Sequence, residues 1–79
     1  MSSRTHIPGK RVRRSRVVRT ERYIVVVEVD AVIPDADPSE ACYEAETVEF
    51  LREVQQHAEH GDVQWLRERG KVYTALDAA

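Results

Sequence analysis

Arginine is concentrated near the start of this 79-residue chain. Ten of its twelve basic residues are arginines, and the candidate phosphate-binding residues are Arg11, Arg13, Arg14, Arg16 and Arg19. A guanidinium group binds a phosphate through paired hydrogen bonds, so this segment is suited to following a nucleic-acid backbone. No aromatic residue precedes Tyr23, so base stacking is not expected from the segment, and any such binding would be independent of nucleotide sequence.

The two parts of the chain carry opposite charge, although the net charge is only −2. Residues 1–22 hold eight Lys or Arg and one Glu, whereas residues 23–79 hold four Lys or Arg and thirteen acidic residues. Such a split indicates either a polyanionic partner for the basic segment or neutralisation between the two parts, within one chain or between chains.

A second group with ligand chemistry is formed by Glu53, His57, His60 and Asp62. Side chains of these types bind zinc, which needs three or four N, O or S ligands. The spacing "HAEH" lacks the "HExxH" pattern of a metalloprotease helix. Two histidines near a helix C-terminus are also favoured by the helix dipole when protonated. We therefore predict no metal site.

No catalytic constellation emerges from the remaining polar residues. Cys42 is the single cysteine, and on one helix it would lie more than roughly 20 Å from His57, too far for a thiol–imidazole pair within one chain. The three glycines are isolated, so no phosphate-binding loop is present. We expect a protein without enzymatic activity and without a cofactor.

Alternating apolar residues predict a strand over residues 17–33, preceded by a flexible basic arm at residues 1–16. From Tyr23 to Ile33, every second residue falls on one apolar side. On the other side, Ile24 and Val26 are followed by Glu28 and Asp30, so this face begins apolar and becomes acidic. The Ile24 and Val26 end is a candidate interface.

Helix signals follow Pro34, which ends the strand. In "DADPSEA", Asp37 suits an N-cap, Pro38 suits the first helical position, and Glu40 suits the reciprocal capping position. We therefore predict a helix over residues 38–60 that ends at Gly61. Asp62 is expected to cap a short helix over residues 63–69, closed by Gly70. The alternation in "KVYTAL" predicts a second strand over residues 71–76.

The long helix is predicted to be amphipathic. Its core face comprises Tyr43, Thr47, Phe50, Leu51, Val54 and Ala58, with Ala41, Ala45 and Val48 extending it. The opposite stripe contains Glu46, Glu49 and Glu53, which form either an ordinary solvated surface or a docking surface for a basic partner. Trp65 is interpreted as a core anchor for the short helix, with a partner-facing position as the alternative.

These elements indicate one small two-layer α+β domain, residues 17–79, with the order β-α-α-β. Two strands make a poor sheet, so we expect a homodimer that completes it. The leading hypothesis is an interaction module that binds another protein; the alternative is a nucleic-acid-associated protein that uses its arginine-rich arm. A lone cysteine and the lack of a long apolar run predict a cytoplasmic protein without membrane contact.

Overall fold

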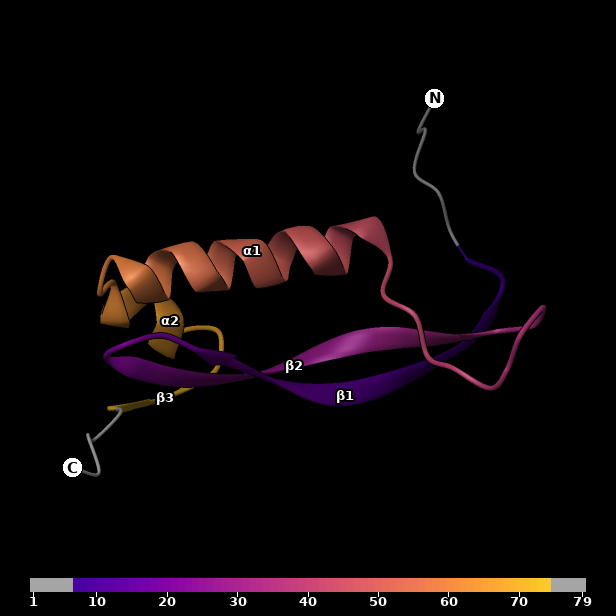
Figure 1. The fold of residues 1–79 in the computed structure, drawn as a ribbon, viewed down its shortest axis with the longest axis horizontal. Coiled ribbons are helices and arrows are strands. Elements are labelled where there is room, and N and C mark those ends of the chain that lie inside the picture. Colours follow the sequence, from indigo (N-terminus) through magenta and orange to yellow (C-terminus); the bar gives the residue numbers. More distant parts are fainter. Residues whose placement is uncertain (1–6, 75–79) are drawn as a thin grey trace.

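A computed structural model describes residues 7–74, which form a three-stranded antiparallel sheet and two helices. The strands are β1 (Gly9–Arg19), β2 (Tyr23–Pro34) and β3 (Lys71–Thr74), in the spatial order β1-β2-β3. The helices are α1 (Ala45–Glu59) and α2 (Val63–Arg67). Figure 1 shows a long, twisted β1–β2 hairpin with α1 running above it. The predicted α+β class is confirmed.

The predicted continuous strand over residues 17–33 is wrong, because a tight turn at Glu21 and Arg22 divides it into β1 and β2. Thr20 closes this turn with its own side chain: its hydroxyl accepts a hydrogen bond from Tyr23 N (3.1 Å) and donates one to Tyr23 O (3.3 Å). Thr20 N also donates to Tyr23 O at 2.9 Å. This turn therefore forms without glycine or asparagine, and the Thr20 hydroxyl supplies two of its hydrogen bonds.

The basic segment is therefore a strand along most of its length, and residues 9–16, expected in a flexible arm, belong to β1. Each β1 residue from Gly9 to Arg19 pairs with a β2 residue, from Pro34 down to Ile24, without an interruption in the register. Residues 1–6 of the expected arm lie outside the described residues. One chain builds a three-stranded sheet, so the expectation of only two strands per chain is wrong.

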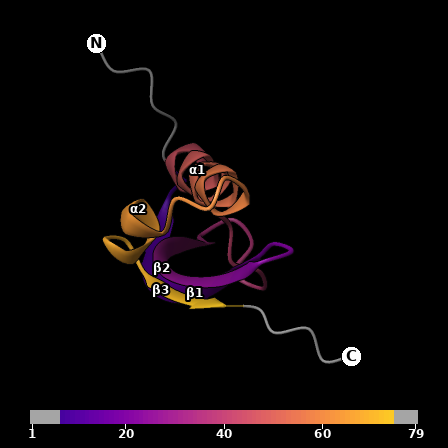
Figure 2. The ribbon, with the colours of Figure 1, turned by 90° about the vertical axis from the view of Figure 1, so that its left-hand side faces the viewer.

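Both helices lie on one side of the sheet, and no helix covers the other side, as Figure 2 shows. The core lies between the two layers. Its buried residues from the sheet are Val18, Val25, Val27 and Val29, and those from the helices are Val54, Ala58 and Leu66. Phe50 and Leu51 of α1 and Trp65 of α2 pack against this cluster while partly exposed. Phe50 and Leu51 belong to the predicted core face of the long helix.

Helix α1 begins at Ala45, seven residues later than predicted. Asp37 accepts hydrogen bonds from Ser39 N (3.3 Å) and Ser39 Oγ (2.5 Å). The predicted cap residue therefore forms a local turn instead of starting a helix. Cys42 is then held beside β2 by two backbone hydrogen bonds with Val32, of 2.8 and 2.7 Å. A residue held in this extended bridge cannot be helical, so the helix starts only after it.

The ends of the two helices follow the predicted signals more closely. Gly61 has the left-handed backbone that closes α1, with φ of 73°, and Asp62 Oδ1 accepts from Trp65 N at the start of α2. Helix α2 ends at Arg67 rather than at residue 69. Gly70 does not have a positive φ; a Cβ there would lie 2.3 Å from Val26 O, so glycine allows β3 to approach β2. Residues 75 and 76 of the predicted last strand lie outside the described residues.

Neither helix of the described part of the chain is long and apolar enough to cross a membrane.

Candidate macromolecular interface along strand β1

Strand β1 carries six basic residues and no acidic residue in "GKRVRRSRVVR". The register with β2 assigns each side chain to a face, because paired residues share one face of the sheet. Lys10, Arg14 and Arg16 lie opposite Ile33, Val29 and Val27, on the side of the helices. Arg11, Arg13 and Arg19 lie opposite Val32, Asp30 and Ile24, on the side away from the helices, where Val32 is nevertheless buried. The five predicted arginines therefore occupy one strand but two faces.

Two of these arginines are engaged in ion pairs. Arg11 binds the carboxylate of Glu44 at 2.7 Å, and Arg13 binds Asp30 across the hairpin at 2.9 Å. The Glu44 side chain is 7% exposed, whereas the Arg11 side chain is half exposed. Glu44 also accepts a hydrogen bond from Ile7 N at 3.0 Å, so this carboxylate binds both the backbone before β1 and the Arg11 side chain within it.

The other cations of β1 have no carboxylate within ion-pair distance among residues 7–74. Arg16 lies over the ring of Tyr43, with its guanidinium carbon 5.2 Å from the ring centroid, and it donates to the Tyr43 hydroxyl at 3.4 Å. Arg14 donates to the backbone oxygen of Arg13 at 3.3 Å. Lys10, Arg14, Arg16 and Arg19 are all exposed. Their charge is available to a partner.

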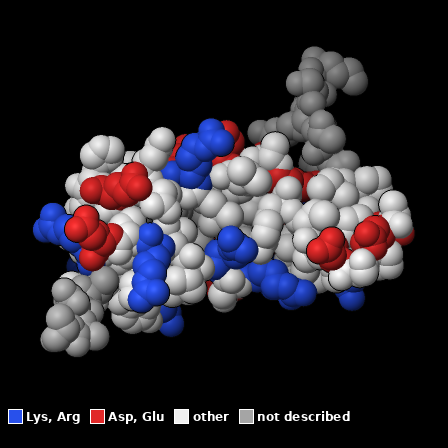
Figure 3. All heavy atoms as spheres, viewed as in Figure 1, with Lys and Arg blue, Asp and Glu red and all other residues white. Residues whose placement is uncertain are grey.

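Figure 3 shows how charge is distributed over one face of the molecule. Most basic side chains in this view lie in the lower half, over the sheet, while acidic side chains lie towards the two ends and, together with basic atoms, along the top, where α1 runs. Glu46, Glu49 and Glu53 are exposed on α1, as predicted for the stripe opposite the core. The basic sheet edge and the acidic helix are thus separate surfaces.

The candidate interface residues Ile24 and Val26 lie on the face of the sheet away from the helices and are partly exposed. Val17 is paired with Val26 and Tyr73 with Ile24, so these four side chains are neighbours. Val17 and Tyr73 are 61% and 51% exposed. We call this group the outer apolar patch: Val17, Ile24, Val26 and Tyr73. Residues from all three strands contribute to it, and the sequence alone showed only two of them.

The histidines do not converge on a metal site. His57 Nδ1 donates to Asp62 Oδ2 at 2.9 Å, and this bond holds the pKa of Asp62 below its ordinary value of 3.8. The His57 ring stacks on Trp65 at a centroid distance of 3.7 Å, and the Arg69 guanidinium lies 3.9 Å from the same indole ring. His60 Nδ1 bonds to Gln56 O instead. No group of three or more His, Cys, Asp or Glu in the described part of the chain is placed to hold a metal ion.

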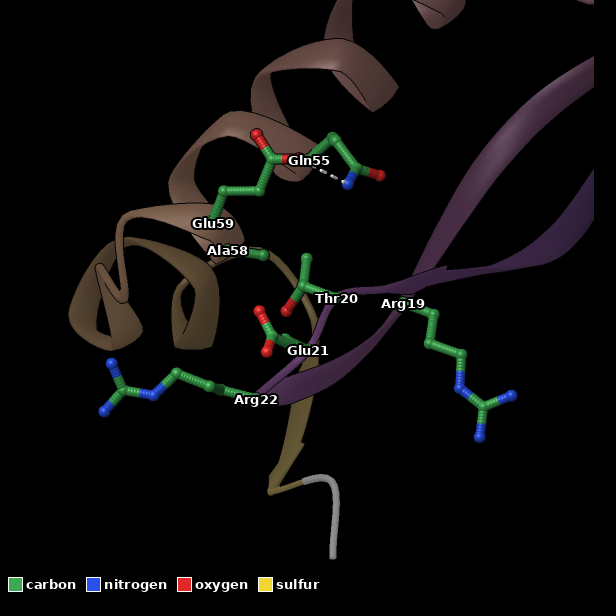
Figure 4. A pocket seen from close by; sticks show the side chains of 7 residues that line it. All are labelled: Arg19, Thr20, Glu21, Arg22, Gln55, Ala58 and Glu59. Carbon is green, nitrogen blue, oxygen red and sulfur yellow. Dashed lines mark hydrogen bonds between the residues drawn. The ribbon is translucent and has the colours of Figure 1, made fainter. Parts of the chain in front are cut away.

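A cavity of about 420 Å³ lies between the β1–β2 turn and the end of α1. Figure 4 shows that Arg19 and Arg22 extend away from it on opposite sides, while Glu21, Gln55 and Glu59 line its wall. Gln55 donates to Glu59 at 3.0 Å. The wall combines carboxylate and amide groups without the convergent set of polar groups that orients a small ligand, so the cavity indicates no chemistry.

Comparison of the chain with protein-family models, with curated proteins and with solved structures found no match.

Proposed function

We propose that this protein is a non-enzymatic interaction module whose strand β1 binds an acidic segment of another protein. One observation carries the proposal: six cations lie on an edge strand, and four of them have no described carboxylate partner. Edge position makes both faces of the strand, and the backbone between them, accessible to a partner.

The expected strength of such binding follows from the exposure of the cations. A solvent-exposed ion pair contributes about 0.2–1 kcal/mol and is weakened by salt. Several pairs must therefore form together, which requires a partner that is acidic over a length comparable with β1. Affinity should fall as the ionic strength rises.

Nucleic acid is the second candidate partner, and the same unpaired guanidinium groups favour it. Contacts would go to phosphates and would be independent of nucleotide sequence. The exposed acidic stripe of α1 is a surface that polyanions of either kind would avoid, which directs both candidates to the sheet edge.

Charge removal on β1 tests the proposal. We would compare the variant Arg14→Gln/Arg16→Gln/Arg19→Gln with a matched control, Arg22→Gln/Arg52→Gln/Arg67→Gln, which removes the same charge from exposed sites elsewhere. The probes are immobilised poly-L-glutamate and an oligodeoxythymidylate, each at about 50 and 200 mM salt. At about 0.5 kcal/mol per lost pair, the β1 variant should bind poly-L-glutamate about tenfold more weakly, and the control should bind like the parent protein.

Equal weakening in both variants, or no weakening in either, would contradict the role of β1. Preferential, β1-dependent retention of the oligonucleotide would favour the nucleic-acid alternative instead.

A second part of the proposal is that two copies associate through the outer apolar patch. Its support is that two helices cover one face of the sheet, while Val17 and Tyr73 on the other face are more than half exposed. Apolar groups gathered on an uncovered face are typical of interaction surfaces.

Sedimentation velocity at micromolar concentration tests this association. It should give a dimer for the parent protein and a monomer for the variant Ile24→Lys/Val26→Lys. A monomeric parent protein would refute this part.

A further inference from the structure

The outer edge of β1 is long, regular and open. It runs for eleven residues without a break in its pairing to β2, and it contains no proline. In the sheet order β1-β2-β3, no strand of residues 7–74 lies beyond it. Of the means by which proteins block a sheet edge, bulges and prolines are absent from residues 9–19, whereas charged side chains are present, and Glu44 contacts Arg11 and Ile7 N at the N-terminal end of the edge.

The hydrogen bonds at the two ends of the hairpin reveal which backbone groups of β1 face outward. Asp35 N donates to Pro8 O at 3.0 Å, and Thr20 N donates to Tyr23 O at 2.9 Å. Both pairs fit the β1–β2 register, and hydrogen-bonded pairs alternate along an antiparallel ladder. Even-numbered residues of β1 therefore bond to β2. The odd-numbered residues direct their N–H and C=O groups away from the sheet: Gly9, Arg11, Arg13, Ser15, Val17 and Arg19.

These outward backbone groups lie between two rows of positive charge. Arg11, Arg13 and Arg19 lie on the uncovered side of the sheet, and Lys10, Arg14 and Arg16 lie on the helix side. Side chains two residues apart on one face are separated by about 6.7 Å, the same interval at which an adjacent strand presents its own side chains. An added strand would thus meet cations on both of its faces.

A second copy of β1 does not fit this position. Pairing two β1 strands would place two rows of six cations side by side, and in the fully overlapping antiparallel register Arg14 would lie directly opposite Arg14; like charges so placed destabilise a strand pair. The charge therefore favours an acidic strand over a second copy of β1.

We propose that an extended acidic segment of a partner protein adds to the sheet as a fourth strand on the outer edge of β1. This inference rests on the proposed function and specifies its geometry. The backbone of the segment bonds to the odd-numbered residues of β1, and its carboxylates pair with the cations on the helix side of the sheet, Lys10, Arg14 and Arg16. Addition of a strand to an open edge is a general mode of peptide recognition, in which the main chain supplies affinity and the side chains supply selectivity.

The alternation of donors and acceptors along the edge favours a polypeptide over a nucleic acid. A peptide backbone offers both N–H and C=O groups at the spacing of the edge. A phosphodiester backbone offers acceptors only, so the outward carbonyls of β1 would gain no partner from it.

The test uses the full chain and a peptide of about nine residues in which Glu and Thr alternate, long enough to span most of β1 at ~3.3 Å per residue. Its control is the same sequence N-methylated along its central residues, which keeps every charge but removes the N–H donors. Fluorescence anisotropy should show that N-methylation weakens binding about tenfold or more, the effect expected for several lost hydrogen bonds.

A variant of the protein provides the reciprocal measurement. Val17→Pro removes one outward N–H, leaves the β1–β2 ladder donors in place and changes no charge. It should also weaken peptide binding about tenfold, while its thermal unfolding remains cooperative. Should this variant fail to fold, the N-methylated peptide decides the question with the unaltered protein.

Four outcomes would overturn strand addition. In the first, N-methylation of the peptide and the Val17→Pro substitution leave binding unchanged, while the Arg14→Gln/Arg16→Gln/Arg19→Gln variant binds the peptide weakly. Strand β1 then acts by charge alone, so the proposed function holds and this inference fails. If the arginine variant binds the peptide normally, both fail. Failure of the peptide to bind at low salt, or β1-dependent binding of oligodeoxythymidylate alone, also overturns the inference.

Discussion

Glu44 joins three parts of the chain through one buried side chain. Its carboxylate binds Arg11 of β1 and accepts from Ile7 N, while its backbone oxygen accepts from Thr47 N (2.9 Å) at the start of α1. The residues around Glu44 in the sequence do not indicate this role, because Glu44 stands among other acidic residues of a predicted helix. Its burial depends on contacts that are distant in the chain.

Neutralising Glu44 should therefore destabilise the protein. Glu44→Gln is expected to lower the free energy of unfolding by about 2 kcal/mol, since hydrogen bonds to charged groups that are removed from water contribute ~1.5–3 kcal/mol. Urea denaturation monitored by circular dichroism measures this change. The control is Glu49→Gln, because Glu49 forms an exposed pair with Arg52 and its loss should cost less than ~0.5 kcal/mol. Equal effects of the two variants would refute the role of Glu44.

Asp62 should make stability depend on pH in the acidic range. The hydrogen bond from His57 lowers the pKa of Asp62 below 3.8 in the folded protein, so the unfolded chain binds a proton first as the pH falls. The stabilisation is complete above the unfolded pKa and is lost as the pH falls through the folded pKa. Melting temperatures of the parent protein and Asp62→Asn should therefore converge as the pH falls from 5 to below about 3. Parallel curves would contradict the contribution of Asp62.

At the level of elements, the helices were easier to predict than the sheet. The closing glycine at residue 61 and the cap at Asp62 follow from local spacing and are confirmed. The predicted core face of α1 is confirmed for Phe50, Leu51, Val54 and Ala58, whereas Val48 is 46% exposed. The start of α1 was misplaced because Cys42 forms a bridge to Val32, a residue ten positions earlier. Local capping signals carry no information about such a contact.

Strand β1 was missed for a different reason. Its faces both carry arginine, so the apolar alternation that marks a half-buried strand is absent over most of its length. The turn that follows contains no glycine, proline or asparagine and is closed by the Thr20 hydroxyl, which sequence rules for hairpins do not recognise. Composition alone makes the arginines candidate binding residues, but their arrangement along a sheet edge follows only from the register with β2.

Deleting residues 1–16 tests whether the basic segment is part of the fold. The deletion removes eight of the eleven residues of β1 and uncovers the β2 edge that pairs with them. The truncated protein should lose cooperative thermal unfolding, because the remaining two-stranded sheet is too small to be stable. A truncated chain that still melts cooperatively near the temperature of the parent would mean that the segment contributes little to folding.

On the scale of the whole molecule, charge is separated across a narrow, elongated body of 45 × 31 × 16 Å. The basic edge strand occupies one long side, and α1 carries four acidic residues against one arginine on the layer above. A net charge of −2 therefore conceals a strong dipole. Such a field attracts an acidic partner to β1 and repels it from α1, which orients the encounter before any contact forms.

The central claim is that β1 binds its partner through the outward backbone groups of its odd-numbered residues. Amide hydrogen exchange, followed by NMR residue by residue, tests it directly. In the free protein, the amides of Arg14 and Arg16 should be protected by β2, and those of Arg13, Ser15 and Val17 should exchange rapidly. Saturation with the alternating Glu and Thr peptide should slow exchange at the odd-numbered residues. Bound peptide that leaves these amides exchanging as fast as before would contradict the claim.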